Sequence, residues 1–181
     1  MIENRRSSPE THGGTTPGVD PADFKRALAR LAGGITVVTS VDGEGSPVGL
    51  TATSVCSVSL DPPLVLVCIG TGSRTHAAID ESGRYAINVL GMGHRSLSER
   101  FAGSGEGKFE GLSWELGRFG LPLLPGAISI CECEVDRRVQ AGDHTIFIAR
   151  VVASAAIDDA EAMPLLWYLG AHRGLGNGNP E

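Results

Sequence analysis

Six apolar segments of strand length, separated mostly by short turns, constrain the fold of this chain more than any other feature. Their residue ranges are 35–41, 48–60, 64–69, 85–90, 127–139 and 145–157. The few helical patterns do not alternate regularly with these strands, so a doubly wound nucleotide-binding fold is not expected. The pattern predicts a mainly β fold, an antiparallel barrel with peripheral helices packed on its outside.

Three short helices are predicted from capping residues and apolar spacing. The first begins near Pro21, with Asp20 as its N-cap, and ends before Gly33. Its apolar residues recur at the spacing of one helix face and are Phe24, Ala27, Leu28 and Leu31. The other two helices are predicted over residues 73–81, where Ser73 can serve as the cap, and 94–101.

Length and charge limit the classes of protein to consider. The 181 residues suit one domain, predicted over 20–173 between a disordered N-terminal tail, 1–19, and a loose C-terminal tail, 174–181. The formal net charge of -6 argues against binding to nucleic acid. The sequence shows neither a signal peptide nor the run of about 20 apolar residues that a membrane helix needs.

The cysteines and histidines favour a cytoplasmic protein without a metal site. All four cysteines lie in apolar segments, and Cys131 and Cys133 have the wrong spacing for a CxxC redox pair or a zinc knuckle. Buried free thiols in a reducing compartment are therefore expected. The five histidines are scattered along the sequence, so no metal ligand is assigned.

Three familiar motifs are absent from the sequence. Lys108 stands where the Rossmann pattern that starts at Gly103 would need its last glycine. Phe109 stands where a phosphate-binding P-loop would need Ser or Thr, and no G-x-S-x-G motif of a serine hydrolase occurs.

A stretch of small polar residues between two apolar strands is the first candidate binding site. It runs from Gly49 to Ser59, and as a continuous strand it would place Thr51, Thr53, Val55 and Ser57 on one face and Ala52, Ser54 and Cys56 on the other. Small residues let a flat ligand approach the backbone, and hydroxyls can hold its polar atoms. The alternative is an edge strand whose hydroxyls face water.

Two further segments are candidates for binding a phosphate. Ser73, Arg74 and Thr75 open a predicted helix, where free N–H groups and a cation can hold an anion, although an ordinary capped helix has the same pattern. Lys108 follows the segment Phe101-Ala102-Gly103 and can reach a phosphate, although such a lysine is more often solvated.

A histidine at the mouth of the last long strand completes the set of candidates. It lies in the segment Gly142-Asp143-His144-Thr145, at a rim where ligand contacts are common. His144 can hydrogen-bond a ligand amide or donate a proton, and it is the one candidate for a catalytic side chain. A turn histidine held by Asp143 is the alternative.

Taken in this order, these pieces resemble the short-chain flavin reductase family, whose members supply reduced flavin to two-component monooxygenases. The segments that carry the resemblance are FKRAL (24–28), GITVVT (34–39), GLTATS (49–54), SVSLDPPL (57–64), FAG (101–103), KF (108–109) and GDH (142–144). The resemblance runs from about Asp20 to Arg173. It implies a homodimeric split β-barrel of the FMN-binding type, which uses NADH or NADPH to reduce FMN or FAD.

The resemblance also implies roles for single residues. The isoalloxazine and ribityl chain would lie against Thr51, Ala52, Thr53, Ser54 and Ser57. The phosphate end would be surrounded by Ser73, Arg74, Thr75, Ala102, Gly103 and Lys108. The nicotinamide would face His144 and the adjoining Thr145. Members of the family often have a tyrosine where this sequence has His172, so the resemblance leaves the structure of that side of the nicotinamide site open.

Hydride transfer between two stacked rings needs little from side chains, so the lack of an obvious acid–base pair agrees with a reductase. Two alternatives remain at this point. One is a flavin-retaining oxidase of the pyridoxamine-phosphate oxidase type, and the other is a non-catalytic flavin or haem carrier. The sequence does not distinguish FMN from FAD or NADH from NADPH, and it does not identify the partner monooxygenase.

Overall fold

The computed structural model of this chain describes residues 18–159 and 162–175. The two predicted tails lie outside these ranges, apart from residues 18–19 and 174–175. None of the helices in the described ranges is long and apolar enough to cross a membrane.

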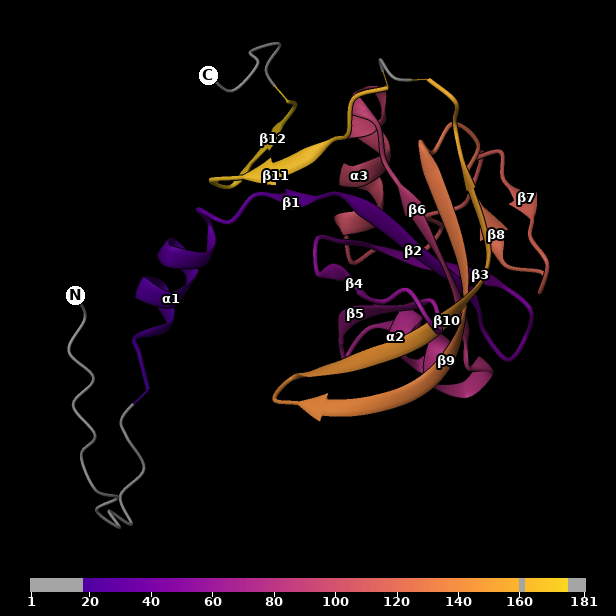
Figure 1. Ribbon diagram of the computed structural model, residues 1–181, viewed down its shortest axis with the longest axis horizontal. Coiled ribbons are helices and arrows are strands. Elements are labelled where there is room, and N and C mark those ends of the chain that lie inside the picture. The colour runs from indigo at the N-terminus through magenta and orange to yellow at the C-terminus, as the bar shows by residue number, and fades with distance from the viewer. Residues whose placement is uncertain (1–17, 160–161, 176–181) are drawn as a thin grey trace.

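Seven strands form one antiparallel sheet that curls around the main core (Figure 1). In spatial order they are β3 (Pro47–Ala52), β2 (Thr36–Val41), β6 (Arg84–Val89), β9 (Ser129–Ala141), β10 (His144–Ala156), β5 (Leu64–Gly70) and β4 (Val55–Ser59). Their inward side chains, including Val38, Val67, Tyr85 and Phe147, form a buried cluster. The prediction of a mainly β fold is confirmed.

The single strand predicted over residues 48–60 is wrong, because two separate strands occupy this segment. β3 pairs with β2 and β4 pairs with β5, so the two strands lie at opposite edges of the sheet. Only Thr53 and Ser54 connect them. Three Cα–Cα steps limit the distance from Ala52 to Val55 to about 11 Å, so the sheet curls until its two edges approach each other.

This bend also changes which side chains share a face. The expected alternation from Thr51 through Ser57 requires one continuous strand, and the bend at Thr53 and Ser54 interrupts it. Ser57 lies exposed on β4, which is the last strand in the order of the sheet, whereas β3 is the first. Sequence periodicity alone cannot predict such a bend, since it arises from the pairing of each half with a different strand.

Five short strands complete the fold. β1 (Gly33–Gly34), β11 (Leu166–Tyr168) and β12 (Ala171–Arg173) form a three-stranded sheet, and β7 (Glu115–Leu116) pairs with β8 (Pro122–Leu123). The glycine-rich segment 103–120 is only partly a surface loop. Its side chains Phe109, Leu112 and Trp114 pack against a second buried cluster around Phe101, because burial removes their apolar surface from water.

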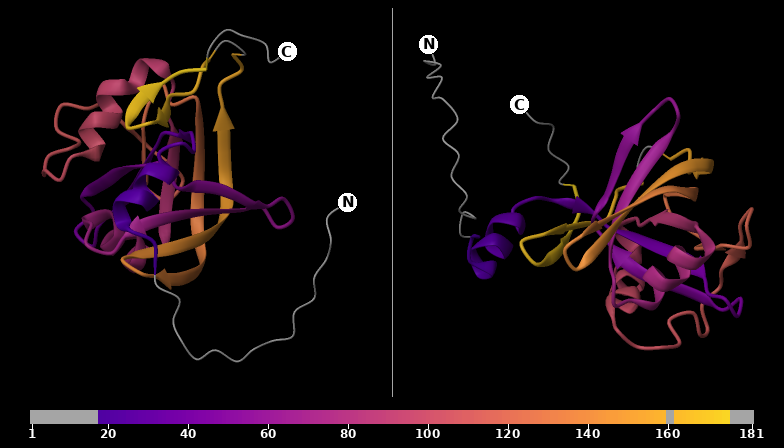
Figure 2. Two further views of the ribbon diagram at one scale, coloured as in Figure 1. Left: turned by 90° about the vertical axis from the view of Figure 1, so that its left-hand side faces the viewer. Right: turned by 90° about the horizontal axis from the view of Figure 1, so that it is seen from below.

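The helices begin where the sequence predicts. α1 (Pro21–Leu28) is capped by Asp20 and α2 (Arg74–Ser82) by Ser73, while the 3-10 turn η1 (Met92–His94) leads into α3 (Arg95–Ala102). α3 buries Phe101 completely, but α1 buries none of its residues and stands away from the curled sheet (Figure 2). α1 ends at Leu28, earlier than the predicted end before Gly33, so Leu31 lies outside the helix. Phe24 is 54% exposed and Leu28 is 51% exposed, so the described chain leaves the apolar face of α1 largely uncovered.

The four cysteines differ in burial. All four are free thiols, and burial raises the pKa of Cys133 and Cys131. Cys133 is buried, whereas Cys68 and Cys131 are half-buried. The expectation of burial is wrong for Cys56, which is exposed because β4 is an edge strand.

Candidate functional site

A cavity of about 740 Å³ lies where the end of β3 meets the start of α2, the end of α3 and the start of β10. Three segments and His144 line it: residues 47–54, most of 68–75, and 101–109. Every site residue predicted from the sequence, except Ser57 and Thr145, lies on this lining. The tertiary structure thus brings together residues that are far apart along the chain, while their ligand contacts stay predictions.

The hydroxyl groups at the end of β3 brace the cavity. Thr51 Oγ1 donates to the carbonyl of Ser98 at 2.7 Å, and Ser54 Oγ donates to the carbonyl of Cys68 at 2.9 Å. These bonds tie β3 to α3 and the following bend to β5. Each hydroxyl keeps acceptor capacity for a ligand because its oxygen carries two lone pairs.

Gly49 begins the candidate stretch of small residues and belongs to the cavity wall, although no role of its own was predicted from the sequence. A Cβ atom at this position would lie 2.8 Å from the Phe101 ring, so a side chain would displace that ring. The signal available in the sequence was a glycine inside a strand, which often marks a close approach of another group.

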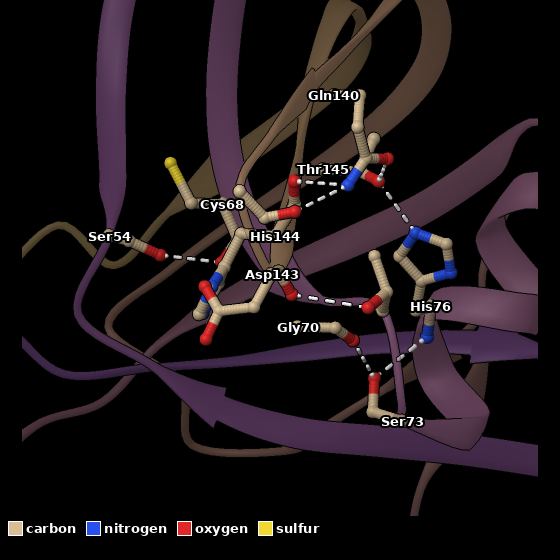
Figure 3. A network of polar contacts seen from close by, with 11 residues as sticks. Ser54, Cys68, Gly70, Ser73, His76, Gln140, Asp143, His144 and Thr145 are labelled. Atoms are coloured by element: carbon tan, nitrogen blue, oxygen red, sulfur yellow. Dashed lines mark hydrogen bonds and ion pairs between the residues drawn. The ribbon is translucent and has the colours of Figure 1, made fainter. Parts of the chain in front are cut away.

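The start of α2 provides the polar end of the cavity. Ser73 Oγ accepts from the backbone N–H of His76 and donates to the carbonyl of Gly70, both at 3.1 Å (Figure 3). The first N–H groups of a helix lack partners within the helix and carry partial positive charge, so they favour an anion. Arg74 lies at the same end, 62% exposed, and pairs at 3.4 Å with both Asp42 and Glu106.

Lys108 is held more firmly than the sequence indicates. Its Nζ donates to the carbonyl of Phe101 at 3.0 Å and to that of Gly49 at 3.2 Å. Partial burial lowers the pKa of Lys108. Since an ammonium group has three N–H donors, one remains for a ligand.

His144 is both held by Asp143 and placed on the cavity, so the two interpretations of this histidine, a turn residue and a ligand contact, are compatible. Its Nδ1 lies 2.7 Å from Asp143 Oδ1, and the ring also lines the cavity, on a strand position paired with Gly70 of β5 (Figure 3). The hydrogen bond with His144 lowers the pKa of Asp143. The neighbouring Thr145 does not line the cavity.

The hydroxyl of Thr145 has hydrogen-bond partners within the protein. It lies 2.8 Å from His76 Nε2 and 3.2 Å from Gln140 Oε1, and the residue is 6% exposed (Figure 3). The predicted contact between Thr145 and a nicotinamide therefore receives no support from the position of this side chain.

A second cavity of about 390 Å³ adjoins the first. The two cavities share four lining residues, which we call the shared wall: Thr51, Ala52, Thr53 and Ala102. The remaining lining residues are Ile35, Ser98, Glu99, Trp167 and His172. Ser98 and Glu99 were not singled out in the sequence. Ser98 lies three positions before Phe101 and so on the same helix face, which is the signal that could have identified it.

The larger cavity has the features of a site for a flat ring system that carries a phosphate. Its volume falls within the range of about 300–1,000 Å³ that is usual for small-molecule sites. Small residues and hydroxyls of β3, the N-terminus of α2, Arg74 and Lys108 all line it. The residues present therefore fit a flavin nucleotide.

Comparison with known proteins gives consistent matches. The family model described as flavin reductase like domain matches residues 28–176. A probable flavin reductase of Rhizobium meliloti is 43% identical over 74% of this chain, which spans 43% of that relative's length. The reductase subunit HsaB of a flavin-dependent monooxygenase from Rhodococcus jostii is 36% identical over 87% of this chain and 79% of its own.

A solved structure matches over a similar length. An NADH:FAD oxidoreductase of Streptomyces globisporus, in complex with NAD and FAD fragments, has a TM-score of 0.81 at 33% identity. The match covers 90% of this chain and 98% of that protein.

Proposed function

Because the chain belongs to the flavin reductase-like family, we propose that it transfers hydride from NADH or NADPH to FMN or FAD and supplies the reduced flavin to a partner monooxygenase. One observation carries this proposal: a single cavity collects the ring-binding and phosphate-binding candidates from β3, α2 and the loop after α3. The name of the Streptomyces globisporus relative supports NADH as the donor. The name of HsaB supports a monooxygenase partner.

The residues of the chain act by positioning. A bound flavin supplies the electron acceptor and the nicotinamide supplies the hydride, so the protein must hold two rings in contact. The shared wall presents small side chains against which rings can lie. The N-terminus of α2, Arg74 and the third N–H of Lys108 hold the phosphate.

His144 holds the nicotinamide side of the site. Because Asp143 engages Nδ1, Nε2 is the ring nitrogen left to hydrogen-bond the carboxamide of the nicotinamide. The exposure of Arg74 at the mouth lets the phosphate re-enter water, which a protein that releases its flavin requires.

The direct test mixes the purified protein with FMN, FAD or riboflavin and with NADH or NADPH, and follows oxidation of the nicotinamide. We expect steady NADH oxidation that depends on added flavin. Flavin binding without any oxidation would instead indicate a carrier. Tight retention of the flavin, with turnover only on a further organic substrate, would indicate an oxidase of the pyridoxamine-phosphate oxidase type.

We also propose that the protein is a homodimer of split β-barrels. The approach of β3 and β4 without a shared ladder in the described residues supports the split barrel. The exposed apolar residues Phe24 and Leu28 of α1, with Leu31 just after the helix, support an interface at this helix, since an exposed apolar patch of this kind marks a contact surface.

Light scattering after size-exclusion chromatography tests the dimer. Phe24→Asp places a charge on the apolar face and should shift the protein to a monomer. The matched control is Ala22→Asp, two positions away and so about 200° around the helix, which should leave the dimer intact. A wild-type monomer, or a Phe24→Asp dimer as tight as the wild type, contradicts the proposed interface.

A further inference from the structure

Ser98 connects three elements behind the shared wall. This residue is 3% exposed, and its two polar groups have different partners. Its carbonyl accepts from Thr51 Oγ1 of β3 at 2.7 Å, and its hydroxyl lies 3.1 Å from His172 Nε2 of β12. A continuous chain of hydrogen bonds therefore links the C-terminal strand to a residue that lines both cavities.

We propose that His172 is a positioning residue for the flavin site, and this inference rests on the proposed function. His172 fixes Ser98, and through it the register of α3 against β3. Two shared-wall residues depend on that register: Thr51, which donates to the Ser98 carbonyl, and Ala102, which ends α3. A shift of α3 would thus change the surface on which the flavin ring lies.

Packing fixes the orientation of the His172 ring. The side chain is 12% exposed, and the ring lies edge-on to Trp167 with the ring centroids 5.1 Å apart. The two residues are paired across β11 and β12. The ring is therefore held from one side by an aromatic neighbour and from the other by Ser98, and a phenyl ring could reproduce only the first contact.

The charge of Glu99 plays a smaller part. Glu99 Oε1 is 3.9 Å from His172 Nδ1, beyond hydrogen-bond distance, and its carboxylate is engaged by Arg95 Nε at 2.9 Å. This hydrogen bond with Arg95 lowers the pKa of Glu99. The contact between Nε2 and Ser98 is thus the one through which His172 acts.

The test compares FMN affinity, measured by quenching of flavin fluorescence, in wild type, His172→Phe and His172→Gln. His172→Phe keeps the ring but loses the hydrogen bond, and we expect the FMN dissociation constant to rise about fivefold. The Gln side chain can restore a polar atom toward Ser98, so His172→Gln should lie within about twofold of wild type. Phe and Gln variants with the same affinity as wild type would overturn the proposal.

A double-mutant cycle separates positioning from general damage to the fold. Ser98→Ala should weaken FMN binding as His172→Phe does, and His172→Phe should add less than about twofold in the Ser98→Ala background. Fully additive losses would overturn the proposal. Glu99→Gln is the control and should leave FMN affinity within about twofold; a loss equal to that of His172→Phe would contradict the assigned role of Nε2.

The two proposals fail in different ways. If wild type binds no FMN and oxidises no NADH, the proposed function is wrong. If wild type does both, and His172→Phe binds FMN as well as it does, the function stands and the role of His172 is wrong.

Discussion

Lys108 and Arg74 are the two cations of the cavity, and their surroundings are opposite. Lys108 is half-buried and bonded to two backbone carbonyls, one in β3 and one in α3. Arg74 is mostly exposed and pairs with two carboxylates. The same charge therefore serves as an internal brace at one position and as an exchangeable contact at the other.

This difference shows why charge alone does not define a phosphate-binding residue. Hydrogen bonds to a charged group inside a protein stabilise it by about 1.5–3 kcal/mol, whereas exposed ion pairs contribute about 0–1 kcal/mol. Lys108 should therefore affect both the fold and the ligand, and Arg74 the ligand alone.

The strongest test of this comparison is Lys108→Met. Loss of the ammonium leaves the carbonyls of Gly49 and Phe101 without their donor. We expect the free energy of unfolding, measured in urea, to fall by about 1–2 kcal/mol, and FMN affinity to fall about tenfold. Lys108→Arg retains donors and charge and should lose less of both. Unchanged stability in Lys108→Met would remove the distinction between the two cations.

Arg74→Gln should affect the ligand without affecting the fold. We expect FMN to bind about tenfold more weakly, because a charge-assisted contact to its phosphate is lost. Riboflavin, which lacks the phosphate, serves as the internal control and should bind as in wild type. The unfolding free energy should change by less than about 0.5 kcal/mol. An equal loss for riboflavin would place Arg74 against the ring instead.

Glu106→Gln tests whether the ion pair with Arg74 opposes the binding of a phosphate. Glu106 pairs with Arg74 at 3.4 Å and so competes with an incoming phosphate. Its removal should tighten FMN binding about twofold at low ionic strength, and the gain should disappear as salt screens the exposed charges. Weaker FMN binding in this variant would mean that Glu106 supports the site.

The smallest expected effect is a change in the pKa of Asp143 when its contact with His144 is removed. The hydrogen bond with His144 lowers the pKa of Asp143, so His144→Ala should return that pKa toward the ordinary value of an aspartate. A carboxyl with a lowered pKa in the folded state adds stability above its ordinary pKa, and this contribution is lost as pH falls through the lowered value. Carboxyl NMR titration measures the change; identical midpoints in the two proteins would contradict the cause.

Local features of the fold were predictable because their interactions span few residues. Asp20 caps α1 through the N–H groups of Ala22 and Asp23, and Ser73 caps α2 through that of His76. The turn before His144 likewise follows from Gly142, which has a positive φ of 63°. Most of the site residues selected from the motif order, all but Ser57 and Thr145, line the cavity, although their ligand contacts stay predictions.

Contacts between distant segments were not predictable in the same way. Lys108 bonds to Gly49, 59 positions away, and Ser98 to His172, 74 positions away. The spacing of the apolar residues indicated one face of the first helix, but it did not predict that the helix ends at Leu28, before Leu31, or that the rest of the described chain leaves that face exposed.

The sequence by itself determined the helix caps and most of the strands, because caps, turns and strand patterning depend on neighbours along the chain. Only the tertiary structure decided that β3 and β4 separate, that Lys108 braces two carbonyls and that His172 reaches Ser98. Those outcomes depend on how the sheet curls and on which distant groups then come within hydrogen-bond distance.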